Sequence, residues 1–365
     1  MKNSFGNTLI LTLFGESHGP AVGAVLDGLA PGIPVDESFL ASQLKLRRPY
    51  GTIGSPRRET DHFSIVSGVF RGKTTGTPLC ILIPNEDVRS DDYESVKELP
   101  RPGHADYTGR CKYHGFEDHR GGGHFSGRLT APLVAAGAIA IAALRDKGIR
   151  IGTHVLRCGG VPDRFFHDLP TDISNLNKAV FPVLDAAAAE AMKQRIERAA
   201  AADDSVGGVL ETAVIGMPAG VGEPWFDSVE GLLSHALFSI PAIKGVQFGD
   251  GFDMADEPGS RFNDEFAVEN GRVITKTNHN GGINGGITNG MTLQFRCMVK
   301  PTPSIRHPQQ TVDLSTMKNS TLQTDGRHDP AIIHRARVVV DSVTALVLYD
   351  LLAGRFGTDY LGCCQ

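Results

Sequence analysis

The longest apolar run of the chain, from Ala131 to Leu144, is the feature that most restricts its fold. The run stops at Arg145-Asp146-Lys147, and Gly148 follows in a position that suits a helix C-terminus. A membrane-spanning helix needs about 20 apolar residues, so this run is too short to cross a bilayer. We therefore expect a helix over 131–147 in the interior of a globular protein.

A glycine-rich stretch comes immediately before this helix. Residues 118–130 read DHRGGGHFSGRLT. Glycine lets backbone N–H groups approach a phosphate closely, and a helix start adds partial positive charge at the same place. The stretch thus suggests an anion-binding loop, although it matches neither G-x-x-x-x-G-K-[ST] nor G-x-G-x-x-G. A flexible surface loop that caps a buried helix explains the same residues equally well.

Strand and helix patterns alternate over the rest of the chain, without an internal repeat or a convincing linker. They favour one compact α/β or α+β domain over residues 1–365 rather than two tethered domains. Pro330 stands where a helix commonly begins, which makes Asp329 the expected N-cap. We expect strands at 9–14, 63–70, 77–83, 149–158, 209–216 and 291–299, a strand or the start of a helix at 22–26, and further helices at 34–43, 184–202, 228–238 and 331–352.

The composition is that of an ordinary soluble enzyme, with a net charge of −5, 41% hydrophobic and 21% charged residues. Such a balance gives no general attraction to nucleic acid, so an anionic partner must be held by local clusters. Residues 1–8 lack the layout of a secretion signal. The six cysteines show no metal-ligand spacing and there is no H-E-x-x-H motif. We therefore expect reduced thiols and no metal site in a cytoplasmic protein.

Many of the 13 histidines fall in glycine-rich turns rather than within helices. His18, His104, His124 and His328 each stand beside glycine, arginine or aspartate, and we expect at least two of them to be catalytic. Basic residues gather in the same loops. They indicate a focused pocket for a multiply anionic substrate, although Arg57-Arg58 can also be explained as solvated surface residues. The basic residues are Lys45, Arg47, Arg48, Arg57, Arg58, Arg101, Arg128, Lys300 and Arg327.

A series of short motifs runs through almost the whole chain. In order, they are Gly15-Glu16-Ser17-His18-Gly19, Arg47-Arg48-Pro49, Arg101-Pro102-Gly103-His104-Ala105-Asp106, Gly121-Gly122-Gly123 with Ser126-Gly127-Arg128, Gly281-Gly282-Ile283 with Gly285-Gly286-Ile287, Lys300-Pro301-Thr302 and Gly326-Arg327-His328-Asp329-Pro330. In this order they resemble the chorismate synthase family. The resemblance implies a single-domain β-α-β sandwich and the anti-1,4-elimination of phosphate from 5-enolpyruvylshikimate 3-phosphate to give chorismate. It also implies a requirement for reduced FMN without net redox change, and a homotetramer with no nucleic-acid or membrane partner.

The resemblance assigns roles by position. His18 corresponds to the acid that protonates the departing phosphate, and His104 to the group that protonates the reduced flavin. Asp329 corresponds to the carboxylate that helps to remove the ring proton. The implied substrate clamps are Arg47, Arg48, Arg128 and Arg327, and the implied flavin contacts are His124, Phe125, Ser126, Pro241, Ala242, Gly285, Lys300, Pro301, Thr302, Pro303, Ser304 and Arg327.

Some positions depart from the family pattern. His124-Phe125 stand where arginine and serine are common, Leu129 where glutamate is, and Pro241 where asparagine is. One alternative function is a net-redox FMN oxidoreductase that acts on a phosphorylated anionic metabolite. Another is a protein that binds a phosphometabolite or takes part in an assembly without catalysis. Because there is no dinucleotide fingerprint, we expect NADPH only as an indirect or external reductant, although some relatives reduce their own flavin.

Overall fold

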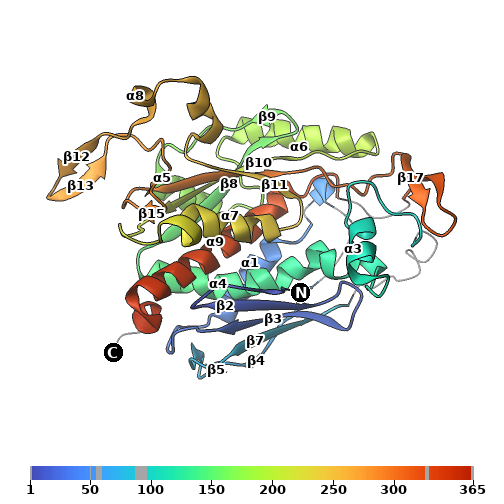
Figure 1. Cartoon of the computed structure of the whole chain (residues 1–365), viewed down its shortest axis with the longest axis horizontal. Helices are drawn as coiled ribbons and strands as arrows, with labels where there is room; N and C mark the ends of the chain where they lie inside the picture. The colour runs from blue at the N-terminus through green and yellow to red at the C-terminus, as the bar shows by residue number, and fades with distance from the viewer. Residues whose placement is uncertain (1, 50, 55–59, 87–96, 325–328, 363–365) are drawn as a thin grey trace.

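The computed structural model describes residues 2–49, 51–54, 60–86, 97–324 and 329–362, and over these ranges a pair of antiparallel sheets encloses a layer of helices (Figure 1). Each sheet has five strands. In spatial order, the first comprises β1 (Ser4–Phe5), β2 (Ile10–Gly15), β3 (Ala21–Asp27), β7 (Leu79–Pro84) and β4 (Ser64–Ser67). The second comprises β11 (Ile243–Phe248), β16 (Leu293–Val299), β10 (Gly208–Ile215), β8 (Arg150–Cys158) and β9 (Val161–Pro162).

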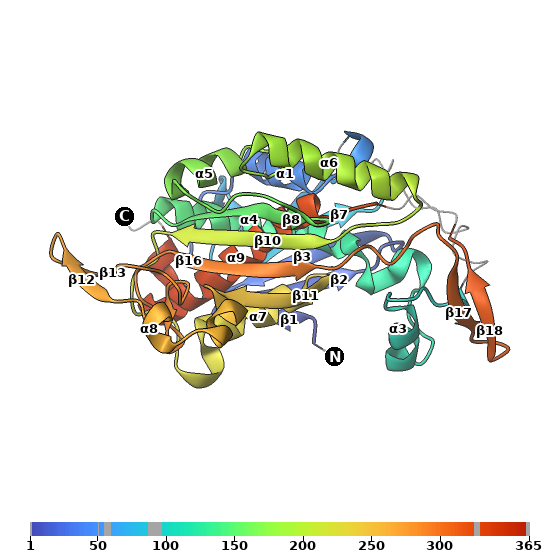
Figure 2. The same ribbon diagram turned by 90° about the horizontal axis from the view of Figure 1, so that it is seen from above.

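The helical layer is built mainly from α1 (Glu37–Leu46), α4 (Thr130–Asp146), α7 (Val229–Ser239) and α9 (Ile333–Phe356). Helix α4 packs against β3 and β7, whereas α9 packs against β8 and β10. Seen from above, the strands of the second sheet lie side by side with α9 behind them (Figure 2). The expected β-α-β sandwich is therefore confirmed.

The two central helices touch each other at a glycine. A Cβ atom placed on Gly137 of α4 would lie 2.3 Å from the Cβ of Ser342 in α9, so only glycine permits this approach. By length and composition alone, the segment Gly127–Asp146 could cross a membrane, but 89% of its apolar window is buried inside the protein. The apolar run thus forms the core of the sandwich, as expected from the sequence.

The expected strands and helices are all present, with small shifts at their ends. The segment 22–26 is a strand within β3. The segment 63–70 divides into β4 and β5 (Val69–Phe70), because Gly68 turns the chain there with a φ of +83°. Three helices were not expected from the sequence, α3 (Asp106–Tyr113), α5 (Leu169–Leu176) and α8 (Gly259–Phe262). All three are short. Helix α3 is largely polar, whereas α5 has Leu169, Ile173 and Leu176 at helical spacing but over only eight residues.

The start of α9 differs from the expectation. The helix begins at Ile333, and its N-cap residue Ile332 makes no capping side-chain hydrogen bond. Asp329 lies further upstream, where its Oδ2 accepts a hydrogen bond from Nη1 of Arg335 at 2.5 Å. The prediction that Asp329 is the N-cap is wrong, because Ile332 holds that position and the Asp329 carboxylate pairs with an arginine of the first helical turn.

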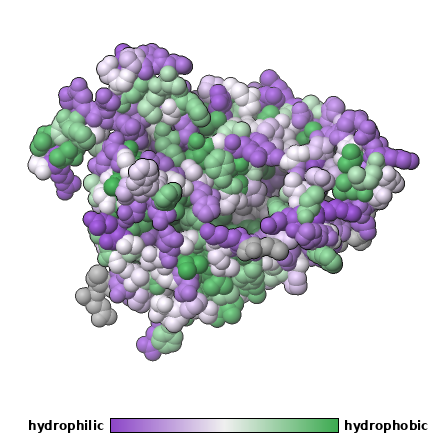
Figure 3. Space-filling view, viewed as in Figure 1, coloured by the Kyte–Doolittle hydropathy of each residue, from purple (hydrophilic) through white to green (hydrophobic). Residues whose placement is uncertain are grey.

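The remaining elements are short, apart from helix α6, and several lie at the periphery. The hairpin of β12 (Phe266–Glu269) and β13 (Arg272–Thr275) projects from the sandwich (Figure 1), and apolar surface is visible at this projection (Figure 3). Phe266, Val268 and Val273 are exposed on one face of the hairpin. The other elements are α6 (Ala186–Ala201), α8 (Gly259–Phe262), β6 (Lys73–Thr74), β12 (Phe266–Glu269), β13 (Arg272–Thr275), β14 (Ile283–Asn284), β15 (Ile287–Thr288), β17 (Gln309–Asp313), β18 (Lys318–Leu322), and the 3₁₀ turns η1 (Gly51–Ile53), η2 (Arg120–Phe125), η3 (Gly127–Leu129), η4 (Trp225–Asp227), η5 (Gly251–Asp256) and η6 (Thr358–Leu361).

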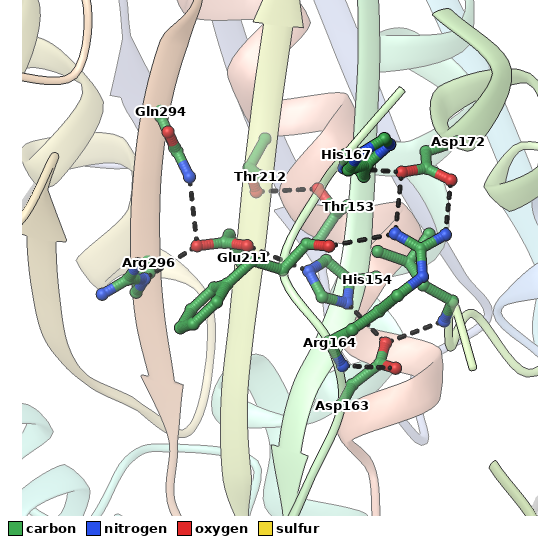
Figure 4. Close-up of polar contacts among 12 residues, drawn as sticks. Thr153, His154, Asp163, Arg164, His167, Asp172, Glu211, Thr212, Gln294 and Arg296 are labelled. Atoms are coloured by element: carbon green, nitrogen blue, oxygen red, sulfur yellow. Dashed lines mark hydrogen bonds and ion pairs between the residues drawn. The ribbon is translucent and has the colours of Figure 1, made fainter. Parts of the chain in front are cut away.

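A buried polar network crosses the second sheet (Figure 4). Nδ1 of His154 lies 2.8 Å from Oδ2 of Asp163, and its Nε2 lies 3.1 Å from Oε2 of Glu211. Nε of Arg296 donates to the other oxygen of Glu211 at 2.8 Å. Burial opposes the charged form of His154, but the two carboxylates outweigh it and raise the pKa of the imidazole. The side chain of His154 thus joins the segment at Asp163 to the sheet.

Candidate active site

One large cavity collects most of the residues singled out in the sequence. Its volume is about 1580 Å³, and its wall is formed by loops that follow β2, α1 and β16 together with the starts of α4 and α9. The expected site residues that line it are His18, Arg47, Arg48, His104, His124, Phe125, Ser126, Arg128, Pro241, Ala242, Lys300, Thr302, Pro303, Ser304 and Asp329.

A few expected residues fall elsewhere. Pro301 is not part of the wall, although both of its neighbours in the chain are. Gly285 lies between β14 and β15, and it does not line the cavity either. The predictions for Arg57, Arg58, Arg327 and His328 concern positions outside the described residues.

The turn that carries His18 is held from both sides. Strand β2 ends at Gly15, whose φ of +98° starts the turn. The side-chain amide of Asn85 then donates to the carbonyl oxygens of Glu16 and Gly19 at 2.9 and 2.8 Å. His18 itself is buried at the cavity wall. Its imidazole is thus carried by a braced loop rather than by a free one.

The glycine run ahead of α4 lies directly against both catalytic candidates. All three glycines have positive φ, at 61°, 85° and 52° for Gly121, Gly122 and Gly123. A Cβ on Gly121 would lie 2.5 Å from Nε2 of His18, and a Cβ on Gly122 would lie 3.3 Å from Cε1 of His104. Gly122 and Gly123 are buried, so the glycine run itself is not a surface loop. Because these glycines have no side chains, Gly121 leaves room for the imidazole of His18 and Gly122 leaves room for that of His104.

His104 belongs to a cluster with Arg101 and Asp106. Its Nδ1 lies 2.6 Å from Oδ1 of Asp106, while Nε and Nη2 of Arg101 each donate to that carboxylate at 2.7 Å. Burial alone would raise the pKa of Asp106, but the hydrogen bonds from Arg101 and His104 outweigh it and hold the pKa well below its usual range. Asp106 is therefore a carboxylate at any working pH.

Two arginines of the cavity share a buried counter-charge. Nη1 of Arg128 forms a short ion pair with Oδ1 of Asp61, and Nε of Arg48 lies 3.8 Å from Oδ2 of the same carboxylate. Arg128 also donates from Nε to Oδ1 of Asn85 at 2.9 Å and from Nη2 to the carbonyl of Pro84 at 3.0 Å. Nε of Arg48, although buried, makes no hydrogen bond to any described residue. It remains a donor for an anion in the cavity.

A second ion pair lies in the wall of the same cavity. Arg335 donates from Nη1 to Asp329 at 2.5 Å and from Nε to the backbone carbonyl of Arg47 at 2.6 Å. It thereby joins the start of α9 to the loop after α1. Arg335 was not recognised in the sequence, since it lies six residues beyond Asp329 within a helix and belongs to no motif.

The loop after β16 is tied to the His104 turn. The ammonium of Lys300 donates to the carbonyl oxygen of Gly103, and Nη1 of Arg101 donates to Oγ of Ser304 at 3.3 Å. The backbone N–H of Lys300 also donates to the carbonyl of Ala242 at 2.9 Å. Ala242 has a φ of +77°, a conformation that is uncommon for residues other than glycine and that often occurs at functional sites.

The departures from the family pattern are part of the wall. Nδ1 of His124 donates to the carbonyl of Gly15 at 2.8 Å, because a carbonyl can only accept. Phe125 keeps 38% of its surface exposed and packs against Tyr113 with ring centroids 6.0 Å apart. The cavity therefore combines cationic donors with an aromatic face.

These features suit a large anionic ligand better than a metal ion. Binding sites for small molecules commonly occupy about 300–1,000 Å³, so this cavity can hold two such ligands. Its wall has guanidinium and ammonium groups for phosphates and carboxylates, and apolar side chains for a flat ring system. Among the described residues, no group of three or more His, Cys, Asp and Glu side chains could hold a metal ion.

Comparisons with known proteins agree over nearly the full length. A family model described as chorismate synthase matches residues 9–353. The chain is 46% identical to the chorismate synthase of Thermococcus kodakarensis over 350 residues, which cover 96% of this chain and 97% of the relative. It is 45% identical to that of Aeropyrum pernix over 355 residues, covering 96% and 93%. A crystal structure of chorismate synthase superposes with a TM-score of 0.75 at 28% identity, covering 98% of this chain and 95% of the other.

Proposed function

The chain belongs to the chorismate synthase family of lyases, and from this premise we propose that it eliminates phosphate from 5-enolpyruvylshikimate 3-phosphate to give chorismate. The observation that carries the proposal is the shared cavity. His18, His104, Arg128 and Asp329 come from distant parts of the chain and line the same wall. A binding or assembly protein would have no need for two imidazoles held by glycine contacts.

The substrate's negative charges would be held by Arg47, Arg48 and Arg128. Arg48 supports this role with its unused Nε donor, and Asp61 keeps Arg48 and Arg128 on the same side of the cavity. Guanidinium forks match phosphate and carboxylate oxygens and orient them as well as binding them. Arg327 joins this set on the family pattern alone.

We propose reduced FMN as the cofactor, since the cavity has room for it beside the substrate. When bound, it would supply electron density that weakens the bond to phosphate and is returned by the end of each turnover. Of the residues proposed to hold it, nine line the cavity, namely His124, Phe125, Ser126, Pro241, Ala242, Lys300, Thr302, Pro303 and Ser304. Gly285, Pro301 and Arg327 are proposed on the family pattern alone.

The protein's own contribution is proton transfer and charge stabilisation. His18 protonates the departing phosphate, so that a less charged group leaves. His104 keeps a proton at the flavin edge, and Asp329 accepts the proton lost from the substrate ring. The ion pair with Arg335 fixes the direction of the Asp329 carboxylate. Proton transfer by positioned groups of this kind typically contributes about 10²- to 10⁴-fold to the rate.

An anaerobic assay with chemically reduced FMN tests the function. One equivalent of reduced flavin should support many molecules of chorismate, with one phosphate released for each. A net-redox oxidoreductase would instead form one product per flavin and stop. His18→Ala and His104→Ala should lose most of kcat but little substrate affinity. Unchanged activity in both variants would favour a non-catalytic binding protein.

We also propose that the flavin is reduced by an external system, because the sequence has no dinucleotide fingerprint. Chorismate formation from NADPH and oxidised FMN without another protein would contradict this. A cytoplasmic homotetramer of single-domain subunits spanning residues 1–365 completes the proposal. The exposed apolar face of the β12–β13 hairpin supports association, since such surfaces commonly contact another chain. Sedimentation of the purified protein tests the subunit number.

A further inference from the structure

The carboxylate of Asp106 is fully committed to two neighbours. It accepts hydrogen bonds from the backbone N–H, Nε and Nη2 of Arg101 at 2.9, 2.7 and 2.7 Å, and it contacts Nδ1 of His104 at 2.6 Å. A carboxylate has about four acceptor positions, so these contacts use all of them. Asp106 thus does not serve as a substrate ligand, and its chemistry acts through its neighbours.

The shorter of two contacts at Nδ1 decides where the proton of His104 lies. Nη2 of Arg101 is 3.1 Å from Nδ1, whereas Oδ1 of Asp106 is only 2.6 Å away. A guanidinium can only donate and an ionised carboxylate can only accept. If Nδ1 had no hydrogen, the closer contact would set two lone pairs against each other. Nδ1 therefore carries the hydrogen and donates it to Asp106.

We propose that Asp106 is the positioning residue of His104, holding the imidazole through Nδ1 so that Nε2 is the nitrogen that gives and takes a proton in the cavity. The meaning of this for catalysis rests on the proposed function, but the assignment of the nitrogens does not. Nε2 has no hydrogen-bond partner among the described residues, and the His104 side chain keeps 18% of its surface exposed.

Two further contacts keep the ring in this orientation. Gly122 lies against the other edge of the imidazole, where a Cβ would be 3.3 Å from Cε1 and 3.5 Å from Nε2. Rotating the ring by half a turn would also place a carbon against Asp106 and lose the bond at Nδ1. Arg101 joins the cluster to Ser304 at 3.3 Å. The position of Nε2 is therefore linked to the loop after β16.

Replacing Asp106 by asparagine should reverse the neutral tautomer. Arg101 presents several N–H donors to this side chain, so the single amide oxygen is expected to turn towards the guanidinium. The amide NH₂ then faces His104 and donates to Nδ1, which leaves the hydrogen on Nε2. In that form Nε2 can no longer accept a proton, and the imidazolium loses its adjacent negative charge.

The tautomer can be read directly from ¹⁵N spectra of the full-length protein with labelled histidine, since the two nitrogens of a neutral imidazole differ strongly in shift. The signals of His104 are assigned by their loss in His104→Gln. The wild type should show hydrogen on Nδ1, and Asp106→Asn should show it on Nε2. A wild-type signal with hydrogen on Nε2 would by itself overturn the proposal, whether or not the variant folds.

Asp118→Asn is the matched control. Asp118 accepts from the backbone N–H, Nε and Nη2 of Arg120 at 3.1, 2.8 and 2.8 Å, which repeats the arginine contacts of Asp106. It takes no part in the contacts of His104 given above. Losing this pair should leave the His104 tautomer as in the wild type. A switch in this control would mean that the tautomer responds to general disturbance, which contradicts the proposal.

Kinetics under anaerobic conditions with reduced FMN provide a second readout. Asp106→Asn should lower kcat by about 10²- to 10⁴-fold, change KM little, and alter the pH profile. Asp106→Glu keeps a carboxylate, and it should retain hydrogen on Nδ1 and recover some of the activity. An Asp106→Asn protein with the wild-type tautomer and kcat would refute the proposal. If the tautomer switches in Asp106→Asn but the wild-type protein itself makes no chorismate, only the proposed function is refuted.

Discussion

Gly121→Ala tests whether the glycine run positions His18. A Cβ at residue 121 would lie 2.5 Å from Nε2 of His18, whereas ordinary contacts begin at 3.4 Å, so the imidazole must move by about 0.9 Å. The φ of +61° adds the cost of a left-handed conformation, about 1–2 kcal/mol. A displacement of about 1 Å can lower a rate about 10²-fold. We expect that loss in kcat, together with a modest loss in stability.

Gly72→Ala is the control for backbone strain. Gly72 has a φ of +73°, and a Cβ there would meet no atom within 4 Å. The Gly72→Ala variant should lose about 1–2 kcal/mol of unfolding free energy, measured with urea, but keep the wild-type kcat. Full activity in Gly121→Ala, with a stability like that of the control, would show that the glycine contact does not position His18.

Other changes test the charges and the core by urea unfolding. Asparagine in Asp61→Asn tolerates the φ of 50° at this position, but it leaves Arg128 buried beside a neutral group. We therefore expect the free energy of unfolding to fall by about 3–5 kcal/mol. A fall below about 1 kcal/mol would contradict the role of the ion pair. His154 has a pKa raised by its two carboxylates against the effect of burial, so its stabilising contribution is present below about pH 6.5 and is lost as the pH rises through the folded-state value. The wild type should therefore exceed His154→Gln in stability more at about pH 6 than at about pH 9, and an advantage that grows with pH would refute this. Gly137→Ala should cost about 1–3 kcal/mol by forcing α4 away from Ser342, and a neutral effect would show that the contact is not tight.

The framework was predictable from the sequence because its signals are local. The apolar run at 131–144 could only be a buried helix, and the strands at 149–158 and 209–216 show β-branched residues between clear turns. The short helix α3 was missed, because its eight residues are mostly polar and its N-terminus lacks a side-chain cap. Local pattern thus identified the long elements that bury a face. It failed for short ones, including α5, which buries Ile173 and Leu176 within only eight residues.

The candidate site was only partly predictable, since its partners are distant in the chain. The sequence indicated that residues 121–123 need open space, but it could not distinguish a phosphate from an imidazole as the occupant of that space. It offered Asp329 as a helix cap, and only the fold reveals the competing ion pair with Arg335. Asp61 and Arg128 are 67 residues apart, so no local pattern could pair them.

The most direct test of the central claim is a crystal structure of the protein with FMN and 5-enolpyruvylshikimate 3-phosphate. Both ligands should lie together in the cavity of about 1580 Å³. A phosphate oxygen of the substrate should come within about 2.6–3.2 Å of the His18 imidazole, and the flavin should lie beside His104. Ligands bound outside this cavity, or a phosphate turned away from His18, would contradict the account.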